Sequence, residues 1–157
     1  MQRSLAHNGS THCGVRQFGS SLVEVLVAAL VLSIGLLGLA SLQATSLHFN
    51  VSALHRSAAT DLAYDITDRM RANRAAALDE AYDGQAFADT PPACAEVTLS
   101  GTRAQRDLQA WTTQLACQLP QGMGAIDRTD DVVTVRIQWD DSRGQEPAQQ
   151  FAMEAEL

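Results

Sequence analysis

The chain has 157 residues, which is enough for one domain with appendages but not for two separate cores. Its 11 basic and 18 acidic side chains give a formal net charge of −7 at pH 7, and every basic residue is an arginine. The only charged residues before Ser20 are Arg3 and Arg16, so the rest of the chain is strongly acidic. Phosphate binding needs a basic surface, which excludes nucleic acid as an expected partner.

The first predicted element is an apolar helix that follows a polar leader, residues 1–19. The run Leu22–Leu42 has the sequence LVEVLVAALVLSIGLLGLASL, and its only charge is Glu24. At a rise of about 1.5 Å per residue the run is about 30 Å long, which matches the hydrocarbon core of a bilayer. Because the basic leader precedes this run and the acidic body follows it, the positive-inside rule predicts a single-pass anchor with a cytoplasmic leader.

The helical pattern continues beyond the apolar run. Apolar side chains recur every three or four residues, which predicts one amphipathic face. They are Leu47, Val51, Leu54, Ala58, Leu62, Ile66 and Met70. Asp65 and Arg69 can pair on the other face, and Arg69, Arg71 and Arg74 suit the end of a helix. We therefore expect one helix from about residue 21 to 77.

This helix divides into an anchoring half, residues 20–43, and an amphipathic half, residues 44–78. Residues 79–157 are expected to form a globular domain. Its first part, 79–104, contains prolines and glycines and predicts a connecting region. A short helix is expected at 105–118, where apolar residues recur at helical spacing. These are Leu108, Trp111, Leu115 and Leu119.

Two alternating patterns predict strands near the C-terminus. The apolar positions are Val133, Val135, Ile137 and Trp139 in the first strand and Phe151, Met153, Ala155 and Leu157 in the second. Residues 140–144 lie between them and are rich in turn formers, which predicts a hairpin. Met123–Asp127 is a candidate for a third strand.

The chain has three cysteines, at Cys13, Cys94 and Cys117. If the leader is removed, two remain, and an even pair in an exported domain indicates a disulfide between Cys94 and Cys117. That bond would close a loop of about two dozen residues and contribute about 3 kcal/mol in the chain-entropy description. The alternative is a pair of buried, unreactive thiols.

The junction between the leader and the apolar run carries a processing motif. An ordinary secretory signal is cleaved after its apolar run, whereas a cut between Gly19 and Ser20 would precede the run and leave the anchor attached. The sequence from Gly19 to Glu24, GSSLVE, resembles the type IV prepilin signal. In that family a prepilin peptidase cuts after the glycine on the cytoplasmic side and methylates the new N-terminus, here Ser20. The chain departs from the family at Ser20, where phenylalanine is usual.

Glu24 occupies the family's glutamate position, the fifth residue counted from Ser20. A carboxylate in hydrocarbon costs several kcal/mol unless it is paired, and here it can reach the free amine of a neighbouring chain. The resemblance therefore implies that Glu24 guides the docking of a new subunit into a filament. The alternative is that Glu24 only lies at the level of the lipid headgroups, about one turn from the start of the helix.

Later segments resemble the PilV family of minor pilins, within the type IV pilin superfamily. They are Leu62–Arg74 (LAYDITDRMRANR), Asp107–Trp111, Leu119–Gly122 and Val132–Asp141. The similarity covers most of the chain after Gly19 except residues 79–104. It implies an α+β, type IV pilin-like fold in which a long N-terminal helix packs on a small antiparallel sheet.

By this resemblance the chain would be a low-abundance subunit that primes or supports type IV pilus assembly. Its partners would be a prepilin peptidase, other minor pilins, the major pilin and a tip adhesin. It would lie in the inner membrane with its globular domain in the periplasm before it joins the pilus. The pseudopilins of type II secretion share the signal and the fold and are the nearest alternative.

Other kinds of site have little support in the sequence. It contains no nucleophile elbow, phosphate-binding glycine loop, metal-binding helix motif or CxxC, so we expect neither enzymatic activity nor a cofactor or metal. Both tryptophans are expected in the core, since each lies on an apolar face. His48 and His55 lack a third ligand for zinc. Asp140 and Asp141 are expected in a solvated turn, because the loop lacks the spaced oxygen ligands of a calcium site.

Two further functions stay open at this point. A secreted binding module or enzyme would carry a conventional signal cut near Ala44–Ser46, where small residues follow the apolar run. A single-pass anchored sensor would keep its leader and would never be cut.

Overall fold

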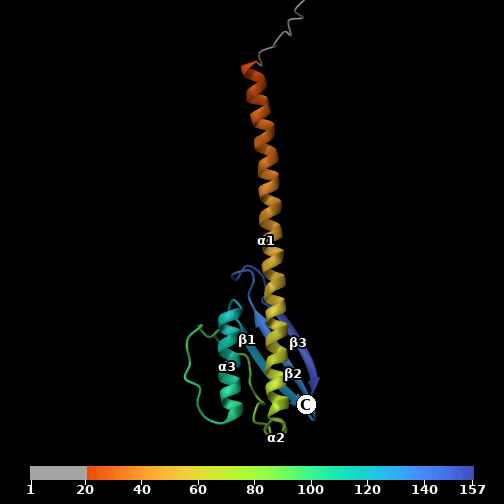
Figure 1. Ribbon diagram of the computed structural model, residues 1–157, viewed down its shortest axis with the longest axis vertical. Coiled ribbons are helices and arrows are strands. Elements are labelled where there is room, and N and C mark those ends of the chain that lie inside the picture. Colours follow the sequence, from red (N-terminus) through yellow and green to blue (C-terminus); the bar gives the residue numbers. More distant parts are fainter. Residues whose placement is uncertain (1–20) are drawn as a thin grey trace, which may run out of the picture. The chain divides into compact units, whose positions relative to one another are not determined.

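The computed structural model describes residues 21–157, so Gly19 and Ser20 lie outside the described residues. Contacts divide the chain into a unit that ends at Ala44 and a second unit, Thr45–Leu157. The elements in chain order are α1 (Leu22–Ala72), α2 (Arg74–Leu78), α3 (Arg103–Gln118), β1 (Met123–Thr129), β2 (Val132–Trp139) and β3 (Gln149–Glu156) (Figure 1). Helix α1 contributes to both units, and each unit is described by itself.

The first unit consists of the N-terminal part of α1. Ser21 starts the helix, because its Oγ accepts a hydrogen bond from the Glu24 amide at 3.3 Å and its carbonyl accepts from the amides of Glu24 and Val25 at 3.0 and 3.2 Å. The side chains of α1 in this unit are exposed throughout. By length and composition, α1 is apolar enough to cross a membrane. The prediction of a long apolar helix near the N-terminus is confirmed.

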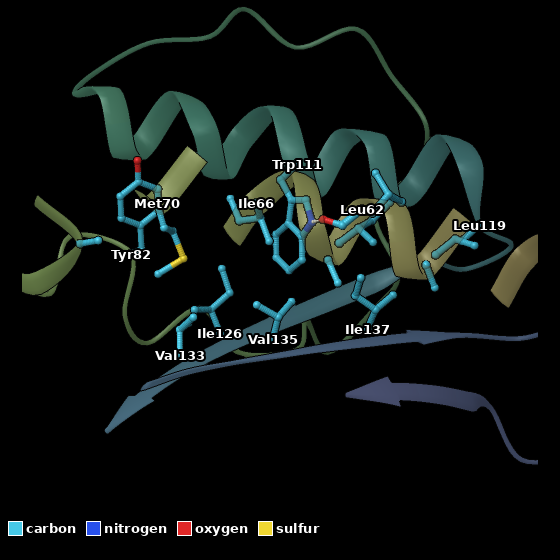
Figure 2. Close-up of a cluster of buried hydrophobic side chains, with 14 of the residues drawn as sticks. Leu62, Ile66, Met70, Tyr82, Trp111, Leu119, Ile126, Val133, Val135 and Ile137 are labelled. Atoms are coloured by element: carbon cyan, nitrogen blue, oxygen red, sulfur yellow. Dashed lines mark hydrogen bonds between the residues drawn. The ribbon is translucent and has the colours of Figure 1, made fainter. Parts of the chain in front are cut away.

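The second unit is an α+β domain with one antiparallel sheet in the order β1-β2-β3. The predicted hairpin is present, with Val135 opposite Met153 in its register. The candidate third strand is also present as β1, which places Ile126 opposite Val135. The second part of α1 and helix α3 lie on the same face of this sheet (Figure 2).

The core fills the space between these two helices and the sheet (Figure 2). Its largest side chains are Trp111, Trp139, Tyr82, Ile66, Met70, Leu115, Ile126 and Ile137. Both tryptophans are buried, as predicted. The Trp111 Nε1–H donates to the Leu62 carbonyl at 3.0 Å, so the polar end of this buried ring is satisfied and joins α3 to α1.

The amphipathic face of α1 is shorter than the sequence predicts. Leu47 and Leu54 are 65% and 66% exposed, and the buried residues of α1 begin at Ala59 and end at Met70. This span rises only about 17 Å along the helix axis, which is the length of helix that the core covers. The predicted amphipathic face, Leu47 to Met70, is therefore buried against the domain only in its second half.

The long helix also ends earlier than predicted. It stops at Ala72, and Asn73 leaves the helical conformation with φ −131°. Asparagine favours such positions because its side chain can bond outside the helix, and here Asn73 Nδ2 donates to the Tyr82 hydroxyl at 3.1 Å. Arg74 consequently starts the separate helix α2 rather than closing the long one.

One glycine is required by close packing between α3 and β1. A Cβ on Gly124 would lie 2.6 Å from Leu115 Cδ1 and 2.7 Å from Trp111 Cζ3. Both of those side chains are buried, so neither can move aside easily. The absence of a side chain at Gly124 lets strand β1 approach helix α3.

Candidate functional site

The predicted assembly residue, Glu24, lies in the first turn of α1. Its backbone amide bonds to Ser21 at the helix start, and its carboxylate is close to the positive end of the helix dipole. Within residues 21–157 the structure gives this carboxylate no ion pair. The cleavage residues Gly19 and Ser20, with the N-methylation expected at Ser20, lie outside the described residues.

Ser21 is a residue that the sequence analysis overlooked. The run Ser21-Leu-Val-Glu24 has the spacing of a capping box, in which a serine caps a helix and a glutamate lies three residues later. The serine half of that motif is formed. The spacing could have located the start of the helix from sequence alone.

The apolar surface of α1 in the first unit is continuous around the helix. Its large side chains between Leu22 and Leu42 are all more than half exposed. A helix that is apolar on every side needs an apolar environment, either lipid or other protein surfaces. Neither environment comes from the chain itself within this unit, so the surface marks contact with something else.

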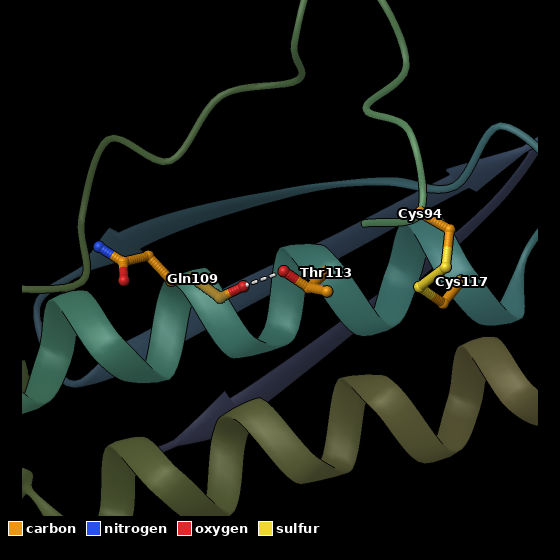
Figure 3. Close-up of a disulfide and its surroundings, with 4 residues drawn as sticks. All are labelled: Cys94, Gln109, Thr113 and Cys117. Carbon is orange, nitrogen blue, oxygen red and sulfur yellow. Dashed lines mark hydrogen bonds between the residues drawn. A yellow bond between two sulfur atoms is a disulfide. The ribbon is translucent and has the colours of Figure 1, made fainter. Parts of the chain in front are cut away.

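The predicted disulfide joins Cys94 to Cys117 with a Cα–Cα distance of 4.6 Å (Figure 3). It connects the loop between α2 and α3 to the last turn of α3. Thr102 caps the other end of the same helix, with its side chain and that of Gln105 forming a capping box. The chain must therefore travel the whole length of α3 between Cys94 and Thr102.

Residues 94–102 must be nearly extended to cover the length of α3. From Thr102 to Cys117 the helix rises about 22 Å, whereas roughly eight residues can span at most about 26–29 Å. The bond thus holds residues 94–102 stretched alongside α3, and Figure 2 shows this segment passing over the helix. Gln109 fixes its end, because Oε1 accepts from the Ser100 amide at 3.0 Å and Nε2 donates to the Ser100 carbonyl at 3.3 Å.

A polar cluster fastens the β2–β3 loop to α1 inside the second unit. Asp141 Oδ1 lies 2.6 Å from His55 Nδ1, and its Oδ2 accepts from the Ser52 hydroxyl at 2.8 Å. The side chains of His55 and Asp141 are largely buried. The expectation of a simply solvated turn is therefore wrong for Asp141, because nothing in the sequence indicated that His55 would face it across the fold.

Asp140 organises the same loop from within. Its carboxylate accepts from the hydroxyl and amide of Ser142, both at 2.8 Å, and from the Gly144 amide. These bonds to Ser142, with the Gly144 bond in addition, lower the pKa of Asp140 below its usual value. Hydrogen bonds within the turn therefore explain why an aspartate occupies position 140, and no metal ion is needed to explain it.

A groove lies between the β2–β3 loop and the first turns of α1 in the second unit. Leu47, Phe49 and Val51 line it from α1, and Ser142, Glu146 and Pro147 are among the loop residues that line it. It combines exposed apolar side chains with polar ones, and no group of three metal-ligating side chains occurs within residues 21–157.

A second polar network lies where the C-terminal end of α1 meets the N-terminal end of α3. The Tyr82 hydroxyl donates to Asp107 Oδ2 at 2.6 Å, and Arg69 Nη1 lies 3.5 Å from Asp107 Oδ1. Burial, followed by this hydrogen bond to Asp107, raises the pKa of Tyr82 above its usual value. The predicted pair of Arg69 with Asp65 is also present at 2.9 Å. The network is structural, since it joins α1, the connecting loop and α3.

Comparisons with known proteins give no family assignment. No protein-family model matches the chain, and neither the curated proteins nor the solved structures include a significant match.

Proposed function

We propose that this chain is a minor pilin of the PilV type, which is cleaved between Gly19 and Ser20 and joins a type IV pilus through helix α1. The observation that carries the proposal is the exposed apolar surface of α1 from Leu22 to Leu42, in which Glu24 is the only charge. A structural subunit with this arrangement needs no enzymatic activity and no cofactor.

The physical support begins with the exposed apolar surface. Burying a leucine or valine side chain stabilises by about 1.5–3 kcal/mol relative to water, so a run such as Leu22–Leu42 is driven strongly into an apolar environment. A bilayer supplies that environment before assembly, and the packed helices of a filament supply it afterwards. The same surface thus serves first as an inner-membrane anchor and then as an assembly interface.

Glu24 supports the choice of a filament over a simple anchor. A carboxylate in hydrocarbon is costly and usually marks a functional pairing. Cleavage before Ser20 would create a free amine four residues from Glu24. In a helical stack the amine of one subunit can neutralise Glu24 of its neighbour, which favours correct docking and disfavours other registers.

The second unit supports the type IV pilin-like layout. Its core buries α1 from Ala59 onward, together with α3, on one face of the three-stranded sheet. This division leaves the N-terminal part of the helix available for contacts between subunits. In the pilin proposal the domain faces the periplasm, and the partners are the prepilin peptidase, other minor pilins, the major pilin and a tip adhesin.

The test is a substitution that removes the charge of Glu24. We expect Glu24→Ala to insert in the membrane normally but to be lost from sheared filaments. Asp61→Ala is the matched control, since Asp61 is an exposed carboxylate elsewhere on α1, and it should be incorporated like the unaltered chain. Normal incorporation of Glu24→Ala, measured by immunoblot of the filament fraction, would contradict the assembly role.

The intact mass of the protein from its own membranes tests the processing. A chain that begins at Ser20 and carries one additional methyl group is expected. A start near Thr45 would indicate a secreted module, and an uncut leader would indicate a sensor-like anchor. Deletion of the gene separates a pilin from a type II pseudopilin, because the first should reduce piliation and the second should block protein secretion.

A further inference from the structure

Strand β3 forms an edge of the sheet that has no partner within residues 21–157. It pairs only with β2, and the sheet order ends there. The opposite edge differs, because the Ile126 amide of β1 donates to the Gln85 carbonyl at 2.7 Å. One edge is therefore partly covered by the chain's own connecting loop, and the other is open.

The register identifies the open backbone groups. The Leu157 amide donates to the Asp131 carbonyl at 3.0 Å, so Leu157 and every second residue before it direct their backbone groups toward β2. The residues between them, including Gln150, Ala152 and Glu154, direct theirs away from the sheet. Their side chains are also exposed.

The contact of Glu156 agrees with this register. Its carbonyl is one of the outward groups, and it accepts hydrogen bonds from Arg71 Nε and Nη2 at 3.2 and 3.0 Å. Arg71 therefore caps the last outward position of the edge. The three positions before it keep their amides and carbonyls unpaired within the described chain.

The charged side chains of β3 and of residues 144–148 before it are all acidic, and the cation that reaches this edge, Arg71, binds the Glu156 carbonyl. Residues 144–157 contain Glu146, Glu154 and Glu156 and no basic residue. The nearest cation on the sheet, Arg136, lies opposite Ala152 but turns toward β1, where it pairs with Asp127 and stacks 5.5 Å from the Phe87 ring centroid. The glutamates of the edge are consequently left without an ion pair.

We propose that the outer edge of β3 binds an extended segment of a partner chain in which basic side chains alternate with apolar ones. Such a segment would add a fourth strand through the outward groups of Gln150, Ala152 and Glu154. Its basic side chains would lie beside Glu154 and Glu156 on the solvent face. Its apolar side chains would lie beside Phe151 and Met153, which are only partly buried at the edge of the core.

Strand β3 is protected against a second copy of itself by its glutamates, but it has no lysine, proline or bulge. Soluble proteins place lysine, proline or a bulge there, or keep the strand short. Strand β3 has 8 residues with the sequence QQFAMEAE. A second copy of the chain fits less well, because two copies of this acidic edge would repel one another. This binding mode is independent of the pilin proposal.

The test uses the full chain in zwitterionic detergent and a fluorescent, end-capped peptide, as long as β3, of alternating arginine and valine. Fluorescence anisotropy should show saturable binding that weakens with added salt. Amide hydrogen exchange should slow at Gln150, Ala152 and Glu154. A peptide of alternating glutamate and valine should not bind.

Two variants locate the site. Ala152→Pro removes an outward amide that has no partner in the chain, which is a position where an edge strand tolerates proline, and should weaken binding about tenfold. Glu154→Gln preserves the shape and should weaken binding about threefold with a smaller salt dependence. Glu96→Gln, at an exposed glutamate in the connecting loop, is the matched control and should bind like the unaltered chain.

Four results would overturn the proposal. The arginine–valine peptide could fail to bind, or bind Glu154→Gln and Glu96→Gln equally well. It could bind without slowing exchange at the three edge amides. The chain could instead self-associate through this edge, with the same amides protected in the absence of peptide.

Discussion

The two parts of helix α1 differ in how their apolar side chains are arranged and in what surrounds them. From Ala59 to Met70 the apolar residues occupy one stripe, and the chain's own sheet and α3 bury that stripe. From Leu22 to Leu42 they occupy all sides of the helix and stay exposed. A helix with apolar side chains on one face only can bury them by packing that face on the domain. A helix that is apolar on all sides cannot be buried in this way, because this small domain covers only one side of it.

This contrast separates two kinds of substitution. In the second unit, the loss of an apolar side chain should change folding stability. In the first unit, it should leave the folded domain unaffected and change only what the helix binds. Three predictions test that separation.

The largest effect is expected from leucine truncation. Leu62 is 4% exposed and Leu36 is 57% exposed. Leu62→Ala should lower the free energy of unfolding of the second unit by about 2–5 kcal/mol, because it removes buried methyl groups and leaves a cavity. Leu36→Ala should change it by less than about 0.5 kcal/mol.

Denaturant titration of the full chain in detergent micelles measures both variants. Tryptophan fluorescence is a suitable signal, because both tryptophans lie in the core of the second unit. Equal destabilisation by the two substitutions would show that the first part of α1 supports the domain, and the contrast between the two parts would fail.

A pair of glycines sharpens the same contrast. Gly124→Ala should destabilise the second unit by about 1–3 kcal/mol, because the new methyl group would overlap the buried Trp111 and Leu115. Gly38 has no heavy atom within 4 Å of an added Cβ. Gly38→Ala should therefore leave the unfolding midpoint unchanged, and thermal unfolding followed by near-ultraviolet circular dichroism compares the two. A stable Gly124→Ala protein would mean that β1 and α3 are less closely packed.

The sequence predicted these elements to different degrees for physical reasons. Periodicity located α1, α3 and the hairpin because each has one regular apolar face. It overestimated the buried stripe, since a pattern such as Leu47 to Leu54 has the same spacing whether or not a sheet is there to cover it. The cysteine count was enough to suggest the disulfide between Cys94 and Cys117.

Contacts between distant segments could not be predicted in the same way. The bond between His55 and Asp141 joins residues far apart in the sequence, and neither residue lies in a motif that specifies a partner. The helix break at Asn73 depends on Tyr82, which a local pattern does not include. The open edge of β3 required the strand order, because the alternating pattern of an edge strand resembles that of a central one.

The smallest expected effect is a pH dependence in the stability of the second unit. Burial and the hydrogen bond to Asp107 raise the pKa of Tyr82, so folding favours the neutral phenol. The stability from this group is fully present below the unfolded pKa of about 10 and is lost as the pH rises through the higher folded value. The chain contains no lysine, so few other groups titrate in this range.

Replacement of each tyrosine isolates the contribution. Tyr82→Phe should cost about 1 kcal/mol at pH 7, because it leaves Asp107 without this donor, and should flatten the stability profile above pH 10. Tyr64 is 55% exposed, so Tyr64→Phe should keep both the stability and the profile of the unaltered chain. Urea titrations between pH 8 and pH 11 provide the comparison. A profile that stays steep in Tyr82→Phe would assign the alkaline loss of stability to another group and remove Tyr82 from the network that holds α1 to α3.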